Sequence, residues 1–236
     1  MNKVVKTRHG EVPGSVALGV NPFIRKVLLV CGILSSLLYV GTDILAAMRW
    51  EGYSYTSQSV SELMAIGSPT RPFIVPLFAV YGALVIAFGI GVWGSAGRKR
   101  ALRFTGILLV AHGAVGFVGL LLFPMHLRGA EGSATDTMHL IVTAIQVLVM
   151  LLYIGFGAAA CGKGFRLYSI GTMLTLLVFG ALAGLQAPRV AAQLPTPWLG
   201  VIERVNIYSS MLWVLVLAII LLPAENSQGS INGSDA

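Results

Sequence analysis

Charged side chains are scarce in this chain. Asp, Glu, Lys and Arg make up 11% of the 236 residues, whereas 56% are apolar. A soluble domain of this length carries about a quarter charged residues, so the composition excludes an ordinary soluble protein. Acidic residues are the rarer charged type, 9 against 16 Lys and Arg. Because there are so few acids, the position of each one is informative.

Motifs that identify common enzyme classes are also missing. The sequence contains no nucleophile elbow, phosphate-binding loop, HExxH pair, CxxC pair or dinucleotide fingerprint. Its two cysteines, Cys31 and Cys161, fall on the side expected to be reducing, which predicts packing roles rather than a disulfide. No single motif therefore assigns an activity.

Long apolar runs are what the chain has instead. Runs of roughly twenty residues are long enough to cross about 30 Å of hydrocarbon as a helix, and none shows the alternation of a barrel strand. We predict an all-α, polytopic transmembrane bundle of six spans, at residues 27–48, 73–93, 104–124, 138–160, 167–186 and 205–222.

Basic residues predict the orientation. Most Lys and Arg residues precede the first run or join runs two to three and four to five, and such an excess marks the cytoplasmic side. We therefore expect both termini to be cytoplasmic and the protein to lie in the plasma membrane. This distribution also accounts for the net charge of +7 through lipid headgroups, so nucleic acid is not an expected partner.

The apolar runs and the composition of the two ends predict one membrane domain with two flanking segments. Residues 1–26 form a basic arm without a signal-peptide core, residues 27–222 the six-helix domain, and residues 223–236 a Gly/Ser/Asn-rich disordered tail. In the first outer loop, the capping-box spacing Ser59-x-x-Glu62 predicts a short interfacial helix.

Most acidic residues and two histidines fall beside the outer loops, and ionisable groups near hydrocarbon suggest function. Asp136 and His139, three residues apart, share a helical face with Thr143 and Gln146. Such a pair can bind a metal or act in acid–base chemistry, and Asp136 can equally be a helix cap. The outer-side group comprises Asp43, Glu51, Glu62, Glu131, Asp136, Glu203, His126 and His139.

Several members of this group have alternative readings. Asp43 needs a partner such as Arg204, Arg71 or a histidine, and is either a structural ion pair or a proton carrier. Glu203 either supports a site or pairs locally with Arg204, and Glu62 either supports a site or only caps a helix. His126 is either a third metal ligand beside Asp136 and His139 or a solvated interfacial histidine.

Four segments resemble the prokaryotic membrane family catalogued as domain of unknown function 998. The resemblance spans most of the folded chain and implies six or seven membrane helices, without implying an activity. The residues of its motifs that become candidate functional residues here are Ser61, Glu62, Asp136, His139, Glu203 and Arg204. A looser analogy links the chain to the zinc-dependent membrane hydrolases that include alkaline ceramidases, although their HxxxH pair is absent. The segments are residues 52–63, 123–129, 135–139 and 203–205.

Two main hypotheses follow. In the first, an outward-facing hydrolase or transferase acts on a lipid or lipid-linked group, using either a divalent metal such as zinc or acid–base chemistry. Its metal ligands would be His126, Asp136 and His139, and its catalytic groups Asp136, His139, Glu62, Ser61, Glu203 and Asp43. In the second, a carrier, lipid-binding, sensor or assembly protein uses the same charges to hold its loops. Haem binding through His112 is a third, weaker alternative.

Overall fold

The computed structural model describes residues 21–231, and every long element in this range is a helix. The only β-type pairing found there is an isolated parallel bridge between Ile66 and His126. Six helices are long and apolar enough to cross a membrane, which confirms the predicted all-α, multi-pass architecture. The elements are α1 (Pro22–Arg49), α2 (Val60–Leu63), α3 (Arg71–Gly94), α4 (Arg100–Leu122), α5 (Ala134–Ala160), α6 (Lys163–Gly184), α7 (Ala187–Ala191) and α8 (Leu199–Ile231).

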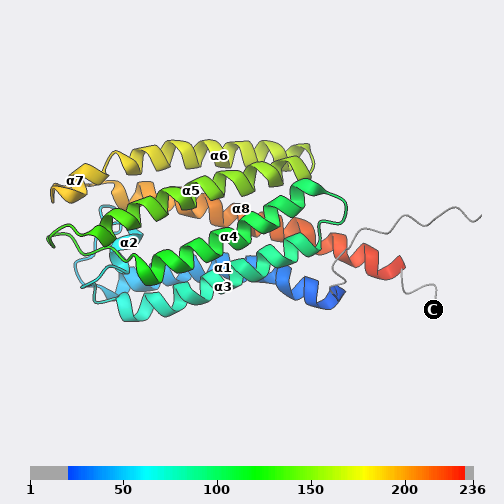
Figure 1. The fold of residues 1–236 in the computed structure, drawn as a ribbon, viewed down its shortest axis with the longest axis horizontal. Coiled ribbons are helices and arrows are strands. Elements are labelled where there is room, and N and C mark those ends of the chain that lie inside the picture. Colours follow the sequence, from blue (N-terminus) through cyan, green and yellow to red (C-terminus); the bar gives the residue numbers. More distant parts are fainter. Residues whose placement is uncertain (1–20, 232–236) are drawn as a thin grey trace, which may run out of the picture.

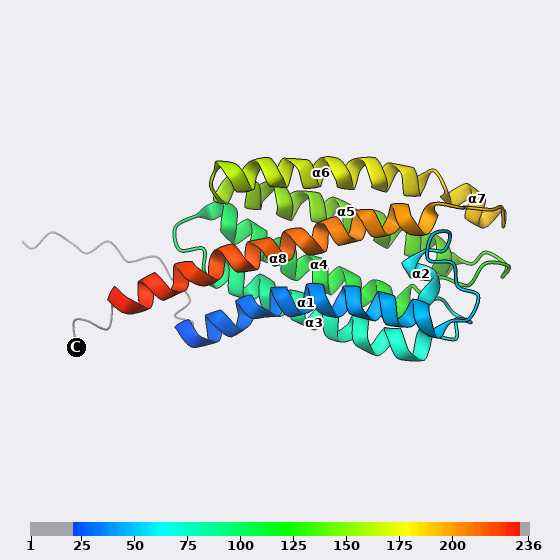
Figure 2. The same cartoon turned by 180° about the vertical axis from the view of Figure 1, so that it is seen from behind.

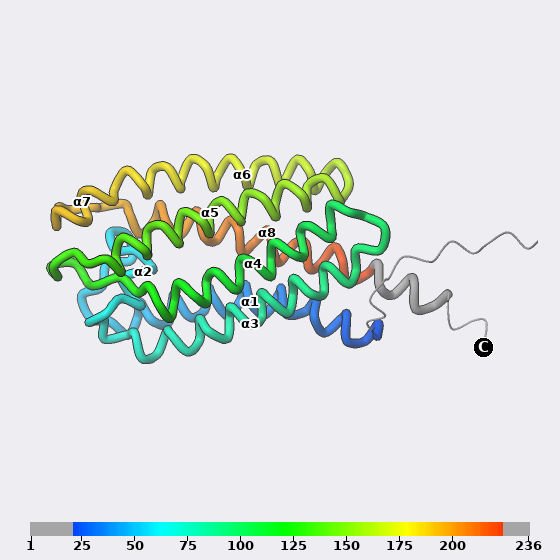
Figure 3. The backbone as a smooth tube through the Cα atoms, viewed as in Figure 1, coloured from blue at the N-terminus to red at the C-terminus, as the bar shows by residue number. Residues whose placement is uncertain are grey.

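The long helices form a closed ring in the order α1, α3, α4, α5, α6, α8, in which each helix packs against its two neighbours. Figures 1 and 2 show the bundle from opposite sides. The start of α1 lies at one end of the bundle, and α2 and α7 lie at the other (Figure 3). We call the latter the α2 end, and we call residues 50–70 the α2 segment.

Aromatic and branched side chains fill the ring. Trp213, Tyr153, Phe88 and Leu109 are fully buried, so the interior is a packed core and not a pore. Helices α3 and α4 approach closely at Gly89, where an added Cβ would lie 2.8 Å from the carbonyl oxygen of Gly106. Close packing of this kind is how membrane helices associate, because lipid gives no hydrophobic drive between them.

The helix ends differ from the predicted boundaries. Helix α1 begins at Pro22, inside the predicted basic arm, because Asn21 caps it by accepting a 2.8 Å bond from the Phe23 N–H. Helix α8 continues past Pro223 to Ile231, where the sequence predicts a disordered tail. The remainders of both predicted segments, residues 1–20 and 232–236, lie outside the described residues.

Candidate functional site

The α2 segment contains a capped helical turn, as predicted. The Ser59 hydroxyl accepts a hydrogen bond from the Glu62 N–H at 3.2 Å, and Glu62 Oε2 accepts one from the Ser59 N–H at 2.7 Å. These reciprocal bonds satisfy backbone donors that have no partner inside so short a helix. The predicted short helix of the first loop is therefore present as α2.

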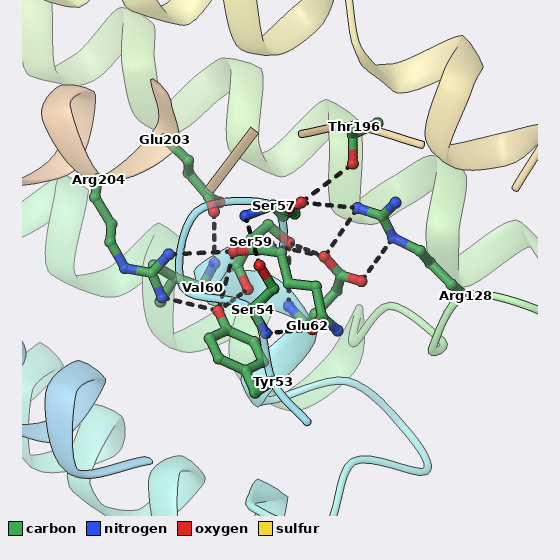
Figure 4. A network of polar contacts seen from close by, with 11 residues as sticks. Tyr53, Ser54, Ser57, Ser59, Val60, Glu62, Arg128, Thr196, Glu203 and Arg204 are labelled. Atoms are coloured by element: carbon green, nitrogen blue, oxygen red, sulfur yellow. Dashed lines mark hydrogen bonds and ion pairs between the residues drawn. The ribbon is translucent and has the colours of Figure 1, made fainter. Parts of the chain in front are cut away.

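Glu62 has a second role that its capping position does not reveal. Its side chain is 1% exposed and receives Arg128 Nε at 2.7 Å and Nη2 at 3.2 Å (Figure 4). Arg128 lies in the segment between α4 and α5, and its side chain is 23% exposed. A bidentate arginine–carboxylate contact is stronger and more directional than a single hydrogen bond. It fixes the α2 segment to the α4–α5 connection.

Asp43 forms the most deeply buried ion pair at this end. Arg204 Nε and Nη2 donate to its two oxygens at 2.8 and 2.9 Å, and the side chains are 0% and 4% exposed. The Tyr208 hydroxyl also donates to Asp43, and the Tyr55 hydroxyl lies 3.1 Å from it. Of the partners considered for Asp43, Arg204 is the one that the structure provides.

The other donors of Arg204 hold the backbone of the α2 segment. Nη1 donates to the carbonyl oxygens of Tyr55 and Gln58 at 2.8 and 3.1 Å, while the guanidinium lies 3.6 Å from the centre of the Tyr55 ring. The Thr56 carbonyl accepts from the Gly200 N–H at 2.9 Å. An added Cβ on Gly200 would collide with the Tyr55 and Gln58 carbonyls, so the segment rests directly on the first turn of α8.

The tyrosines of the α2 segment act as neutral hydrogen-bonding groups. Burial raises the pKa of the Tyr53 hydroxyl well above its ordinary value, although the hydrogen bond from Arg204 opposes this. Burial likewise raises the pKa of Tyr55. The protonated Tyr53 hydroxyl can therefore donate to the carbonyls of Gln58 and Ser59, at 3.0 and 2.8 Å.

Glu203 and Arg204 are neighbours in sequence but point to different partners. Glu203 Oε2 accepts from the Val60 N–H at 2.5 Å, and its other oxygen lies 3.3 Å from the Ser61 hydroxyl. The alternative of a local Glu203–Arg204 pair is therefore wrong, because consecutive side chains on a helix diverge. Glu203 ties the start of α2 to α8 (Figure 4).

His139 contacts the same hydroxyl from α5. Its Nε2 lies 3.3 Å from Ser61 Oγ, and its Nδ1 lies 3.0 Å from the Phe123 carbonyl oxygen. The structure thus brings together three predicted site residues, Ser61, His139 and Glu203, from three elements that are distant in the sequence.

Asp136 serves as a helix cap. With Ser133 it forms a capping box at the start of α5, and its Oδ1 accepts from the His126 N–H at 2.7 Å. The His126 ring also faces Asp136, with Nδ1 3.2 Å from Oδ2, in a partly exposed setting. The capping alternative for Asp136 is confirmed, and His126 is its companion.

The proposed metal ligands do not converge. Within residues 21–231, no group of three His, Cys, Asp or Glu side chains is arranged to hold a metal ion. His126 and Asp136 meet each other, whereas His139 turns toward Phe123 and Ser61. The reason is that Asp136 must point back over the helix start to cap it, away from the face that carries His139 into the bundle.

The rest of the predicted polar stripe also diverges. Thr143 donates to the His139 carbonyl at 2.8 Å. Gln146, with its amide oriented to suit both neighbours, donates to His112 Nδ1 at 2.8 Å. His112 is buried against the edge of the Tyr153 ring, with centroids 5.6 Å apart. These contacts give His112 a packing and hydrogen-bonding role between α4 and α5.

Tyr55 lines two hollows. It was not among the candidate residues expected from the sequence. One, of about 360 Å³, is lined by α8 residues that include Val205, Tyr208 and Leu212, together with Tyr55. The other, of about 410 Å³, is lined by Tyr53, Tyr55 and the end of α1. The available signal was the Tyr53-x-Tyr55 pair, whose rings are typical of a membrane interface. Glu51 and Glu131, by contrast, are exposed.

Comparison with known proteins supplies a family but no activity. Neither a curated protein nor a solved structure matches the chain significantly. The model of a protein family of unknown function, DUF998, matches residues 33–220, a range that includes all six spans in whole or in large part and every ion pair described above. This multi-pass membrane protein therefore belongs to the DUF998 family of unknown function.

Proposed function

We propose that this protein binds a membrane lipid, whose acyl chain lies in the hollows that Tyr55 lines together with α8 and with the end of α1. The observation that carries the proposal is the pair of hollows that Tyr55 lines, about 360 and 410 Å³ in volume. Ligand sites of small molecules occupy about 300–1,000 Å³. A single acyl chain is of this scale.

The walls of the hollows favour a lipid over a water-soluble ligand. Ile44, Met48 and Leu212 line them and are 43%, 77% and 53% exposed. All three belong to helices that are able to span the membrane, so their exposed faces meet hydrocarbon. A ligand that enters sideways from the bilayer needs no aqueous path to these hollows.

The ion pairs support a binding role for this end of the bundle. The oxygens of Asp43 and Glu62 already face arginine donors and backbone or hydroxyl groups. Breaking a buried pair strands a charge, so these carboxylates suit a structural role better than a chemical one. Their effect is to hold the α2 segment, and with it Tyr55, against α1 and α8.

Photo-crosslinking tests the proposal directly. The full chain is placed in nanodiscs that contain a phospholipid with a photoactivatable acyl chain, and the crosslinked residues are mapped by mass spectrometry. We expect crosslinks to be enriched at Met48, Val205 and Leu212. Leu212→Trp, which fills one hollow, should lower the yield there several-fold.

Leu174→Trp is the matched control, because Leu174 is 58% exposed on α6 and lines neither hollow. It should leave the crosslinking beside Tyr55 unchanged. Equal crosslinking over all lipid-facing helices, without enrichment beside Tyr55, would show that lipid only solvates the bundle and would refute a specific site.

A further inference from the structure

The hydroxyl of Ser61 differs from the buried carboxylates of this end because it lies between two hydrogen-bond acceptors. Glu62 and Asp43 each face an arginine, whereas Ser61 Oγ faces two proton acceptors, Glu203 Oε1 and His139 Nε2, both at 3.3 Å. One hydroxyl proton can serve only one acceptor at a time. Ser61 is therefore held where its proton can be withdrawn.

The protonation of His139 follows from its other contact. Nδ1 lies 3.0 Å from the Phe123 carbonyl oxygen, and a carbonyl can only accept. Nδ1 must therefore carry the proton, which leaves the lone pair of a neutral imidazole on Nε2, facing Ser61. A histidine held in one tautomer beside a hydroxyl is the arrangement that activates a serine nucleophile.

We propose that Ser61 and His139 form a nucleophile–base pair that attacks a carboxylic ester of a membrane lipid. Ser61 is half-buried at the start of α2, and His139 lies in the first turns of a spanning helix. The next residue on α5, Leu140, is 55% exposed, so this part of α5 borders hydrocarbon. A substrate that reaches Ser61 from the bilayer is a lipid, and glycerolipids carry their esters near the interface.

The reaction balances without any reagent other than water. Ser61 Oγ bonds to the ester carbonyl carbon while its proton passes to His139 Nε2. The bond from carbon to the alcohol oxygen then breaks, and His139 returns the proton to the departing alkoxide. Water attacks the acyl-serine with His139 again accepting a proton, the carboxylic acid leaves, and Ser61 regains its hydrogen. Glu203 positions Ser61 through the Val60 N–H.

A fluorophosphonate probe, which bonds covalently to activated serines, tests the pair in the full chain in nanodiscs. We expect Ser61 to carry the adduct, located by mass spectrometry. Ser61→Ala should abolish labelling, and His139→Gln should slow it by about 10²-fold or more, the usual contribution of a general base. Ser54→Ala is the matched control, since Ser54 lies in the same segment and its hydroxyl contacts Thr56 and Ser57 and no histidine. It should label like the wild type.

A second pair of variants covers the case in which Ser61→Ala loosens the α2 segment. In a chain with Cys31 and Cys161 replaced by Ala, Ser61→Cys should react with iodoacetamide at least ~10-fold faster than Ser54→Cys, because a neighbouring histidine base favours the thiolate. Folded wild-type protein without a Ser61 adduct, or a Ser61→Cys thiol no faster than that of Ser54→Cys, would overturn the proposal. Lipid crosslinking beside Tyr55 is scored separately, so either proposal can fail alone.

Discussion

Two aspartates at the α2 end contact basic side chains in different surroundings. Asp43 and Arg204 are 0% and 4% exposed and share two hydrogen bonds. Asp136 and His126 are 27% and 30% exposed, and Asp136 is also a helix cap. Charge and burial both separate the two pairs. Arginine is always charged, whereas His126 is charged only when protonated. A partly exposed pair is screened by water and contributes little, whereas removing one partner of a buried pair strands a charge. The two contacts therefore differ in structural importance.

The largest effect should come from breaking the buried pair. Arg204→Leu leaves Asp43 without its cation, and we expect a loss of about 3–5 kcal/mol in the free energy of unfolding, measured by thermal unfolding in detergent. Adding Asp43→Asn should restore part of it, because the stranded charge is then gone. A single variant as stable as the wild type would mean that Asp43 is not buried against Arg204.

A smaller loss of stability is expected for the Glu62–Arg128 pair, whose burial is intermediate. Arg128→Met removes the cation facing Glu62, which is 1% exposed, but Arg128 itself is 23% exposed, so water can partly replace it. We expect a loss of about 1.5–3 kcal/mol, typical of hydrogen bonds to a charged group. Limited proteolysis within residues 50–70 should speed up in parallel. Unchanged proteolysis would show that this pair does not hold the α2 segment.

The contact between Gly200 on α8 and the backbone of the α2 segment can be tested without changing any charge. Gly200→Ala places a methyl group against the Tyr55 and Gln58 carbonyls, and overpacking of this kind costs about 1–3 kcal/mol. Gly171→Ala is the control, because nothing lies within 4 Å of its added Cβ and alanine favours a helix. If both glycines tolerate alanine equally, the segment does not rest on α8.

Breaking the partly exposed His126–Asp136 pair should cause the smallest change in stability. His126→Gln keeps a polar side chain beside Asp136 and leaves the capping box with Ser133 in place. We expect the stability to change by no more than about 1 kcal/mol. A loss as large as that of Arg204→Leu would erase the distinction drawn between the two aspartates.

Local features were predictable from the sequence. The six apolar runs gave the spans because crossing hydrocarbon demands length and internally bonded backbone. Ser59-x-x-Glu62 gave α2, because a capping box involves residues only three apart. Asp136 was foreseen as one of two alternatives for the same reason.

Contacts between distant segments were harder to foresee. Nothing within the sequence near Glu62 points to Arg128, and the choice of Arg204 for Asp43 depends on α1 and α8 being neighbours in the ring. The metal hypothesis did not allow for the direction in which Asp136 points when it caps α5. Ser61 and His139 were both candidates, but their contact required the fold.

The Asp43–Arg204 pair also has a consequence for biosynthesis. Its two residues are 161 positions apart, so α1 is synthesised well before α8. An acidic side chain within a spanning helix is costly to insert without a partner, and Asp43, in the last turns of α1 (Pro22–Arg49), has no arginine from α8 until that helix has been made. A chain in which α8 has not yet been made therefore carries Asp43 in α1 without its cation.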